Sequence, residues 1–226
     1  MNQRYLRNKE TISTYEQKIL ASKSVVLLGC GGLGQYVAMQ LCRAGVGNIT
    51  IIDDGNFEET NLNRQLYCTM KNLFKPKVEE TANFLNDINH EVNVKTIYDR
   101  MTSKNANNYI SGHSVVVDAL DSIKDRLILE KACRELNLTL ISAAIGGWYG
   151  HLAVVRPNDN TLTKIYSDVS MEGIETILGN PSFIPACLAS IEVSEVIKFL
   201  LGKPTLQSGK VLYIDLYNLR FTTINV

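Results

Sequence analysis

A glycine-rich segment, GCGGLG at residues 29–34, has the composition of a phosphate-binding turn. It follows the apolar run SVVLLGC, which predicts a buried parallel strand, and it precedes a segment with helical spacing. Glycines at such a turn leave backbone N–H groups accessible at a helix N-terminus, which attracts anions. The pattern predicts a nucleotide-phosphate site at Gly29, Gly31, Gly32 and Gly34.

Asp53 ends the next apolar run, NITIID, about 20 residues after the glycines. A carboxylate at this place can accept hydrogen bonds from ribose hydroxyls. Two alternatives remain open at this point. The glycines could simply permit close helix–strand packing while Asp53 caps a turn, or the pattern could belong to a dinucleotide oxidoreductase.

Several charged residues after this acid favour nucleotide transfer. Asn61 and Arg64 lie in ETNLNRQ, and Lys77 lies in KPKVEE. A triphosphate needs such cations, because the pyrophosphate leaving group develops negative charge. Asp118 and Asp121 flank the end of the apolar run VVVDALD, and one carboxylate beside phosphates is a typical magnesium ligand. The alternative for each residue alone is a surface charge or a helix cap.

The overall composition limits the classes of partner. Lys and Arg number 23, as do Asp and Glu, so the net charge is zero and we expect neither nucleic acid nor a membrane as partner. The N-terminal MNQRYLRNKE lacks the apolar core of a secretory signal, and no apolar run reaches the roughly 18 residues of a membrane span, so we expect a cytoplasmic location. The length of 226 residues predicts a single domain over residues 1–226.

The five cysteines, at positions 30, 42, 68, 133 and 187, form no C-x-x-C pair, and the chain has three histidines. Structural zinc sites usually contain close ligand pairs, so no zinc is expected. Cys187 has two interpretations: a small buried core residue, or a thiol whose pKa is lowered by the helix that it begins. Cys30 is interpreted as a spacer within the glycine segment.

The elements that must position these residues alternate between strand and helix. This order predicts an α/β fold: a doubly wound, Rossmann-like mixed sheet, parallel in its N-terminal part and antiparallel at its C-terminal end. A polar helical segment comes first. Strands are expected at 24–30, 48–53, 92–98, 114–120, 138–144 and 151–157, helices at 32–44, 76–89, near 105, 123–136 and 186–201, irregular chain at 158–181 and a hairpin at 210–226.

Eight segments together give the chain a resemblance to the ThiF/MoeB/HesA adenylyltransferases, the bacterial relatives of ubiquitin-activating enzymes. The resemblance covers almost the whole length and is carried by RYLR (4–7), GCGGLG (29–34), RAGVGNITIID (43–53), NLNRQ (61–65), PKVE (76–79), DALDSIKDR (118–126), AAIGGWYG (143–150) and SEVIKFLLG (194–202).

The resemblance implies a homodimer that uses ATP and magnesium. The C-terminal glycine carboxylate of a ThiS/MoaD-like ubiquitin-fold sulfur carrier would attack the α-phosphorus and give an acyl-adenylate and pyrophosphate. Such carriers serve the synthesis of thiamine or of the molybdenum/tungsten cofactor. By position, the resemblance assigns the ribose to Asp53, the phosphates to Asn61, Arg64 and Lys77, the magnesium to Asp121, and the γ-phosphate of the neighbouring subunit to Arg7.

Departures from the family pattern leave the substrate open. The chain lacks the two zinc-binding C-x-x-C pairs of many relatives. No cysteine occurs in 158–182, the crossover loop, where relatives that form a thiol link to their carrier place one. Gly55 and Ser122 stand where relatives often have Asp and Asn. A small-molecule carboxylate, as in iron-guanylylpyridinol cofactor synthesis, is therefore an alternative substrate, and a nucleotide-binding scaffold without turnover is another alternative. Trp148 and Tyr149 either pack or line a groove for an extended peptide tail.

Overall fold

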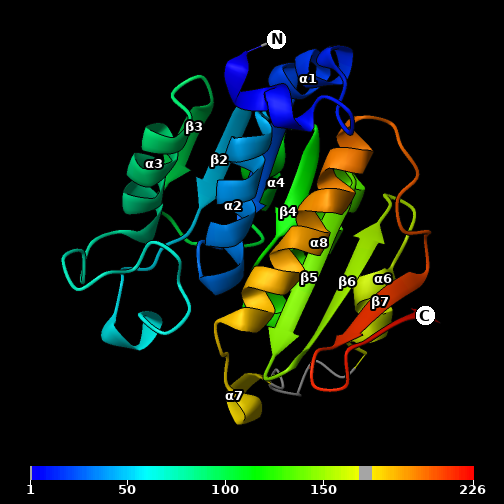
Figure 1. Ribbon diagram of the computed structural model, residues 1–226. Coiled ribbons are helices and arrows are strands. Elements are labelled where there is room, and N and C mark those ends of the chain that lie inside the picture. The colour runs from blue at the N-terminus through cyan, green and yellow to red at the C-terminus, as the bar shows by residue number, and fades with distance from the viewer. Residues whose placement is uncertain (1, 168–174) are drawn as a thin grey trace.

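Eight strands form one continuous sheet in the computed structural model, which describes residues 2–167 and 175–226 (Figure 1). Their spatial order is β3-β2-β1-β4-β5-β6-β7-β8. The first five in this order are parallel, and β6, β7 and β8 continue the sheet in antiparallel pairs, which confirms the predicted mixed sheet. The strands are β1 (Ser24–Leu28), β2 (Asn48–Ile52), β3 (Asn93–Ile97), β4 (Val115–Asp118), β5 (Leu140–Gly146), β6 (Tyr149–Val155), β7 (Lys210–Asp215) and β8 (Arg220–Asn225).

Helices cover both faces of this sheet. One face carries α1 (Thr14–Ser22), α2 (Gly32–Ala44), α3 (Lys77–Ile88) and α8 (Phe183–Leu200), and the other carries α4 (Ala106–Ile110), α5 (Ile123–Glu135) and α6 (Thr161–Ile165) (Figure 1). Three shorter segments, η1 (Gln3–Asn8), η2 (Glu59–Asn61) and α7 (Glu175–Leu178), complete the elements. None of the helices among the described residues is long and apolar enough to cross a membrane.

Strand β1 shows why its sequence is apolar throughout. Val25 and Leu27 pack in the core beneath α2 and α8, whereas Val26 and Leu28 pack in the core beneath α5. All four are fully buried. Successive side chains of a strand point to opposite faces, so a strand covered on both faces needs apolar residues at every position.

The predicted elements occur in the predicted order, with two corrections. Residues 158–181, expected to be irregular, contain the short helices α6 and α7, while 168–174 lie outside the described residues. Helix α8 begins at Phe183, earlier than the expected 186, because Pro185 occupies its first turn, where a missing N–H costs no hydrogen bond.

Helix α6 was missed because its start is stabilised by a residue distant in the sequence. Its N-cap residue, Asn160, makes no side-chain capping bond. Instead, the Glu130 carboxylate of α5 accepts the backbone N–H groups of Leu162 (2.7 Å) and Thr163 (3.1 Å). Asn160 is of a residue type favoured at N-caps, but the hydrogen bonds that begin the helix come from the distant Glu130.

The buried side chain of Glu192 lowers the stability of the folded protein. Glu192 of α8 is fully buried, and neither of its carboxylate oxygens has a hydrogen-bond partner among the described residues. Burial, and then the negative charge of Asp118, raises the pKa of Glu192 well above its ordinary value. Burial therefore favours the protonated form of this side chain in the folded protein.

We predict that Glu192→Gln makes the protein more stable at pH 8 than the wild type, with a smaller gain at pH 5. The unfolded chain ionises Glu192 above its ordinary pKa of 4.5, whereas the folded chain keeps the proton to a higher pH, so wild-type stability falls as pH rises above this value. Each unit of pKa difference corresponds to about 1.4 kcal/mol. Urea unfolding between pH 5 and 8 measures the effect, with the exposed Glu10→Gln as control. Equal pH dependence in the two variants would contradict the interpretation.

Candidate active site

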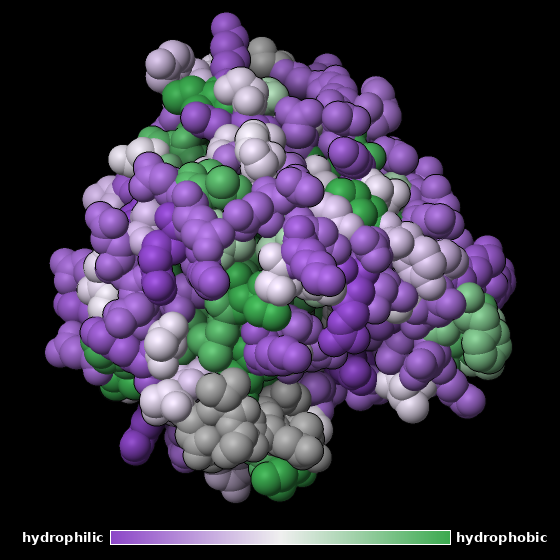
Figure 2. Space-filling view, turned by 180° about the vertical axis from the view of Figure 1, so that it is seen from behind, coloured by the Kyte–Doolittle hydropathy of each residue, from purple (hydrophilic) through white to green (hydrophobic). Residues whose placement is uncertain are grey.

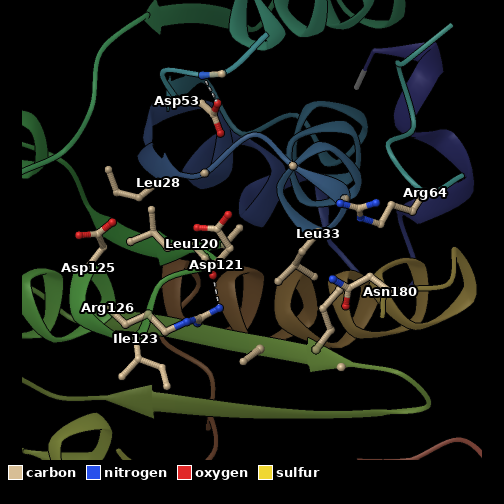
Figure 3. A pocket seen from close by; sticks show the side chains of 18 of the residues that line it. Leu28, Leu33, Asp53, Arg64, Leu120, Asp121, Ile123, Asp125, Arg126 and Asn180 are labelled. Atoms are coloured by element: carbon tan, nitrogen blue, oxygen red, sulfur yellow. Dashed lines mark hydrogen bonds between the residues drawn. The ribbon is translucent and has the colours of Figure 1, made fainter. Parts of the chain in front are cut away.

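A pocket of about 990 Å³ opens at the carboxyl ends of β1, β2, β4 and β5 (Figure 3). Open α/β sheets bind ligands at this edge, where neighbouring strands send their connections to opposite faces. Here β1 leads into α2 on one face, and its neighbour β4 leads into α5 on the other. Of the sequence-predicted residues, the pocket lining includes Gly29, Gly31, Gly32, Asp53, Asn61, Arg64, Lys77 and Asp121, but neither Gly34 nor Arg7.

The glycine segment turns sharply between β1 and α2. Gly29 has φ +96°, and a Cβ at this position would lie 2.4 Å from the carbonyl oxygen of Ala119 in the loop after β4. A Cβ on Gly34 would lie 2.0 Å from the carbonyl oxygen of Gly29. Gly34 therefore permits the close approach of α2 to the turn, while Gly31 and Gly32 line the pocket.

Asp53 is held in a fixed orientation at the pocket wall. Its carboxylate accepts the backbone N–H of Gly55 at 2.7 Å (Figure 3). It also accepts the backbone N–H of Cys30 at 2.6 Å. A Cβ on Gly55 would lie 2.9 Å from both the Asp53 Oδ1 and the Lys77 Nζ. Gly55, a departure from the family pattern, thus leaves room for these two functional groups.

Two cations face the pocket without a carboxylate partner among the described residues: Arg64 and Lys77. The Arg64 guanidinium donates to the carbonyl oxygen of Thr60 (3.0 Å) and to the Asn63 Oδ1 (2.9 Å). Its aliphatic part lies against Gly32, since a Cβ there would be 3.3 Å from the Arg64 Cγ. The positive charges of Arg64 and Lys77 therefore remain available for an anion.

Amide side chains connect the glycine segment to the loop that carries Arg64. Gln35 donates to the carbonyl oxygen of Cys30 (2.9 Å) and accepts the N–H of Tyr67 (2.9 Å). The buried Asn61 accepts the N–H of Glu58 at 3.1 Å and so shapes η2. Sequence reasoning missed Gln35, which looks like an ordinary helix residue.

The two acids at the end of β4 differ in environment. Asp118 is fully buried and forms an ion pair with Arg126 of α5 at 2.8 Å. It also accepts hydrogen bonds from the Ser142 hydroxyl (2.6 Å) and the Leu120 N–H (2.9 Å). Asp121, three residues on, is exposed and lies in the pocket (Figure 3). Asp118 therefore holds the loop, and Asp121 is the acid available to a ligand.

Arg126 and Ser122 fix the other side of this loop. Arg126 also donates to the carbonyl oxygens of Ala143 (2.8 Å) and Leu120 (Figure 3). The Ser122 hydroxyl accepts the N–H of Asp125 and caps α5. Ser and Asn are both good N-caps, so Ser122 preserves this function where relatives often have Asn.

Arg7 lies at the opposite edge of the sheet from this pocket. It belongs to η1, whose Tyr5 hydroxyl accepts a hydrogen bond from Asn89, just beyond the end of α3, at 2.9 Å. In Figure 1, η1 is near the N-terminus label, away from the carboxyl ends of the parallel strands. The predicted role of Arg7 in a neighbouring subunit stays a prediction.

The cysteines are unreactive in character. Burial raises the pKa of the Cys30 thiol to about 12, in agreement with its interpretation as a spacer. Burial also raises the pKa of Cys187, which favours the interpretation of this partly buried thiol as a core residue. The described residues contain no group of three or more His, Cys, Asp or Glu side chains that could hold a metal ion.

A second part of the pocket is lined by aromatic side chains, of which the sequence analysis named only one. Tyr149, named as a possible groove residue, lines it together with His151, Tyr166 and Tyr213. Trp148 instead packs against Phe183 at the surface, with the two rings tilted at 39° and 45% of its area exposed. No local motif marks His151 or Tyr166, because their approach depends on the packing of α6 against β6.

Comparisons with known proteins agree with this geometry. The profile of the ThiF family matches residues 4–226. The SAMP-activating enzyme E1 of Haloferax volcanii is 28% identical over 208 residues, which cover 91% of this chain and 77% of that protein. The molybdopterin-synthase adenylyltransferase of Haemophilus influenzae is 29% identical over 93% of this chain and 88% of its own. The crystal structure of E. coli MccB with MccA-N7isoASN superposes with a TM-score of 0.87 at 23% identity over 100% of this chain and 72% of that chain, which shows a common fold.

We predict that Arg126→Leu destabilises the protein by about 3–5 kcal/mol, because it leaves the Asp118 carboxylate buried without its counter-charge. Chemical unfolding at pH 7 measures the loss. The matched control is Lys124→Leu, which removes an exposed cation from the same helix. A loss as small as that of the control would contradict a structural role for the ion pair.

Proposed function

Since this chain belongs to the ThiF family and is by class an ATP-dependent adenylyltransferase, we propose that it adenylates the C-terminal glycine carboxylate of a ThiS/MoaD-like ubiquitin-fold sulfur carrier. The products are an acyl-adenylate and pyrophosphate. The observation that carries the proposal is the pocket's asymmetry: uncompensated cations and a free carboxylate lie beside the glycine turn, and an uncharged region lies next to them.

ATP is proposed to lie across the glycine turn. The fixed carboxylate of Asp53 suits the ribose hydroxyls, and the cations Arg64 and Lys77 suit the phosphates. Asn61 lines the same wall of the pocket and is proposed to bind the phosphates as well. Gly34 is proposed not to contact the nucleotide and instead permits the close packing of α2 against the glycine turn. The chemistry of the Asp53, Asn61, Arg64 and Lys77 side chains and their common pocket support these roles.

The residues present also fit a magnesium ion. Asp121 is an exposed oxygen ligand in the pocket with no ion pair among the described residues, whereas Asp118 is engaged by Arg126. Protein-bound magnesium typically takes one or two carboxylates together with substrate phosphates. When bound, it neutralises charge on the phosphate oxygens.

The chemistry requires no general base. A substrate carboxylate is already ionised at neutral pH, so its oxygen can attack the α-phosphorus directly. A carboxylate–phosphorus bond forms while the bond from the α-phosphorus to the bridging oxygen breaks, and pyrophosphate leaves with that electron pair. Arg64 and Lys77 stabilise the departing charge, and the pocket aligns the reactants.

Further parts of the proposal rest on the family resemblance. Residues 1–226 form one adenylyltransferase domain in a homodimer. Arg7 reaches the γ-phosphate of the ATP that is bound by the neighbouring subunit. The protein is proposed to act in the cytoplasm and to bind no zinc. Neither nucleic acid nor a membrane is proposed as a partner.

ATP–pyrophosphate exchange with magnesium tests the substrate class. Carrier proteins ending in Gly-Gly and small carboxylates are added in separate panels. Exchange with a carrier alone supports the proposal, and exchange with a small acid alone replaces it with small-molecule activation. ATP binding without exchange in either panel favours a scaffold without turnover.

We predict that Asp121→Ala and Arg64→Ala each cost roughly 2–4 kcal/mol of transition-state stabilisation, in the range found for lost oxyanion donors. The kcat/KM of carrier-dependent exchange measures this loss. Asp87→Ala, which removes an exposed carboxylate from α3, is the matched control and should retain wild-type exchange. Wild-type rates in both test variants would rule out the assigned roles.

A further inference from the structure

The pocket extends beyond the proposed nucleotide residues to a region that we call the ring subsite: Tyr149, His151, Tyr166 and Tyr213. Tyr149 and His151 are two residues apart on β6 and so point to the same face of the sheet. Tyr213 of β7 is the register partner of His151, and Tyr166 follows α6. Figure 2 shows the molecule from behind, where the surface is mostly polar and apolar side chains lie between polar ones in the lower half.

His151 and Tyr166 form a hydrogen-bonded pair in this subsite. The His151 Nε2 lies 3.0 Å from the Tyr166 hydroxyl oxygen. Burial, and then the positive charge of Arg126, lowers the pKa of His151 to about 4, so the imidazole is neutral at pH 7. A neutral imidazole has one donor and one acceptor nitrogen, and Nδ1 has no hydrogen-bond partner among the described residues.

The ring subsite also lacks charge. None of its four side chains is charged at neutral pH. The nearby Arg126 is engaged by Asp118 and by the carbonyl oxygen of Ala143. A charged group bound here would lose its water without gaining a counter-charge from the described residues, which is strongly unfavourable. A peptide amide needs only one acceptor and one donor, and the ring faces can cover its apolar neighbours.

We propose that His151 and Tyr166 are a specificity-determining pair that positions an uncharged backbone amide of an extended peptide C-terminus, next to the carboxylate that reacts. The inference rests on the proposed function and adds to it that the residue before the substrate's terminal glycine must be uncharged. His151 acts as a positioning residue and takes no part in bond making.

The test compares KM for carrier and KM for ATP in exchange assays. His151→Leu should raise the carrier KM about 10-fold, as expected for one lost hydrogen bond that leaves its partner unpaired, with the ATP KM within about two-fold of the wild type. His151→Gln, which keeps a donor and an acceptor, should restore most of the loss. Tyr166→Phe should act like His151→Leu.

A carrier ending in Asp-Gly should be used more than about 10-fold less well than one ending in Gly-Gly.

His113→Leu is the matched control. His113 is likewise partly buried and hydrogen-bonded to a hydroxyl, that of Thr50 at 3.0 Å, but it does not line the pocket. Its carrier KM should equal that of the wild type. Equal changes of the two KM values in His151→Leu, no rescue by His151→Gln, or equal use of the two carriers would overturn the inference.

A binding experiment separates this inference from the proposed function. If no carrier supports exchange by the wild type, acetyl-glycyl-glycine is titrated onto the ATP-bound protein and observed by ligand NMR. Binding that is lost in His151→Leu and kept in His113→Leu sustains the subsite while the carrier hypothesis fails. Absence of binding to the wild type at millimolar concentrations overturns the subsite as well.

Discussion

The buried ion pair between Asp118 and Arg126 is the interaction on which the site depends. Asp118 ends β4 at the point where the chain must leave the sheet, and full burial makes its charge very unfavourable without a partner. Arg126 supplies that partner and also binds the loop carbonyl of Leu120. The loop that holds Asp121 is thus fixed between β4 and α5. Gly29 then permits the glycine turn to approach the same loop at Ala119.

This arrangement divides the pocket by charge. Around the glycine turn, Arg64 and Lys77 keep their charge free of carboxylates among the described residues, which suits a polyphosphate. Around β6 and β7, His151 is neutral because of burial and the nearby Arg126. The same guanidinium therefore stabilises Asp118 and disfavours a second positive charge in the ring subsite. A single buried cation contributes to the properties of both regions.

The absence of a reactive cysteine in the pocket agrees with this division of roles. Burial raises the pKa of both Cys30 and Cys187, so neither thiol has the character of a nucleophile. The proposed reaction needs none, because the carboxylate of the substrate is the nucleophile. Alignment of the reactants and stabilisation of the leaving group account for the catalysis that the pocket can provide.

The sequence by itself determined the alternation of elements, the glycine turn and the position of Asp53, because each depends on a short stretch of chain. Apolar runs such as β1 are buried on both faces and are recognisable without knowledge of their neighbours. The tertiary structure alone decided which of Asp118 and Asp121 is free, because Asp118 is engaged by Ser142, 24 residues away. It likewise decided the cap of α6 by Glu130, 32 residues from Leu162, and the pairing of His151 with Tyr166. Such contacts bring together residues that no local pattern connects, and burial then sets their charge.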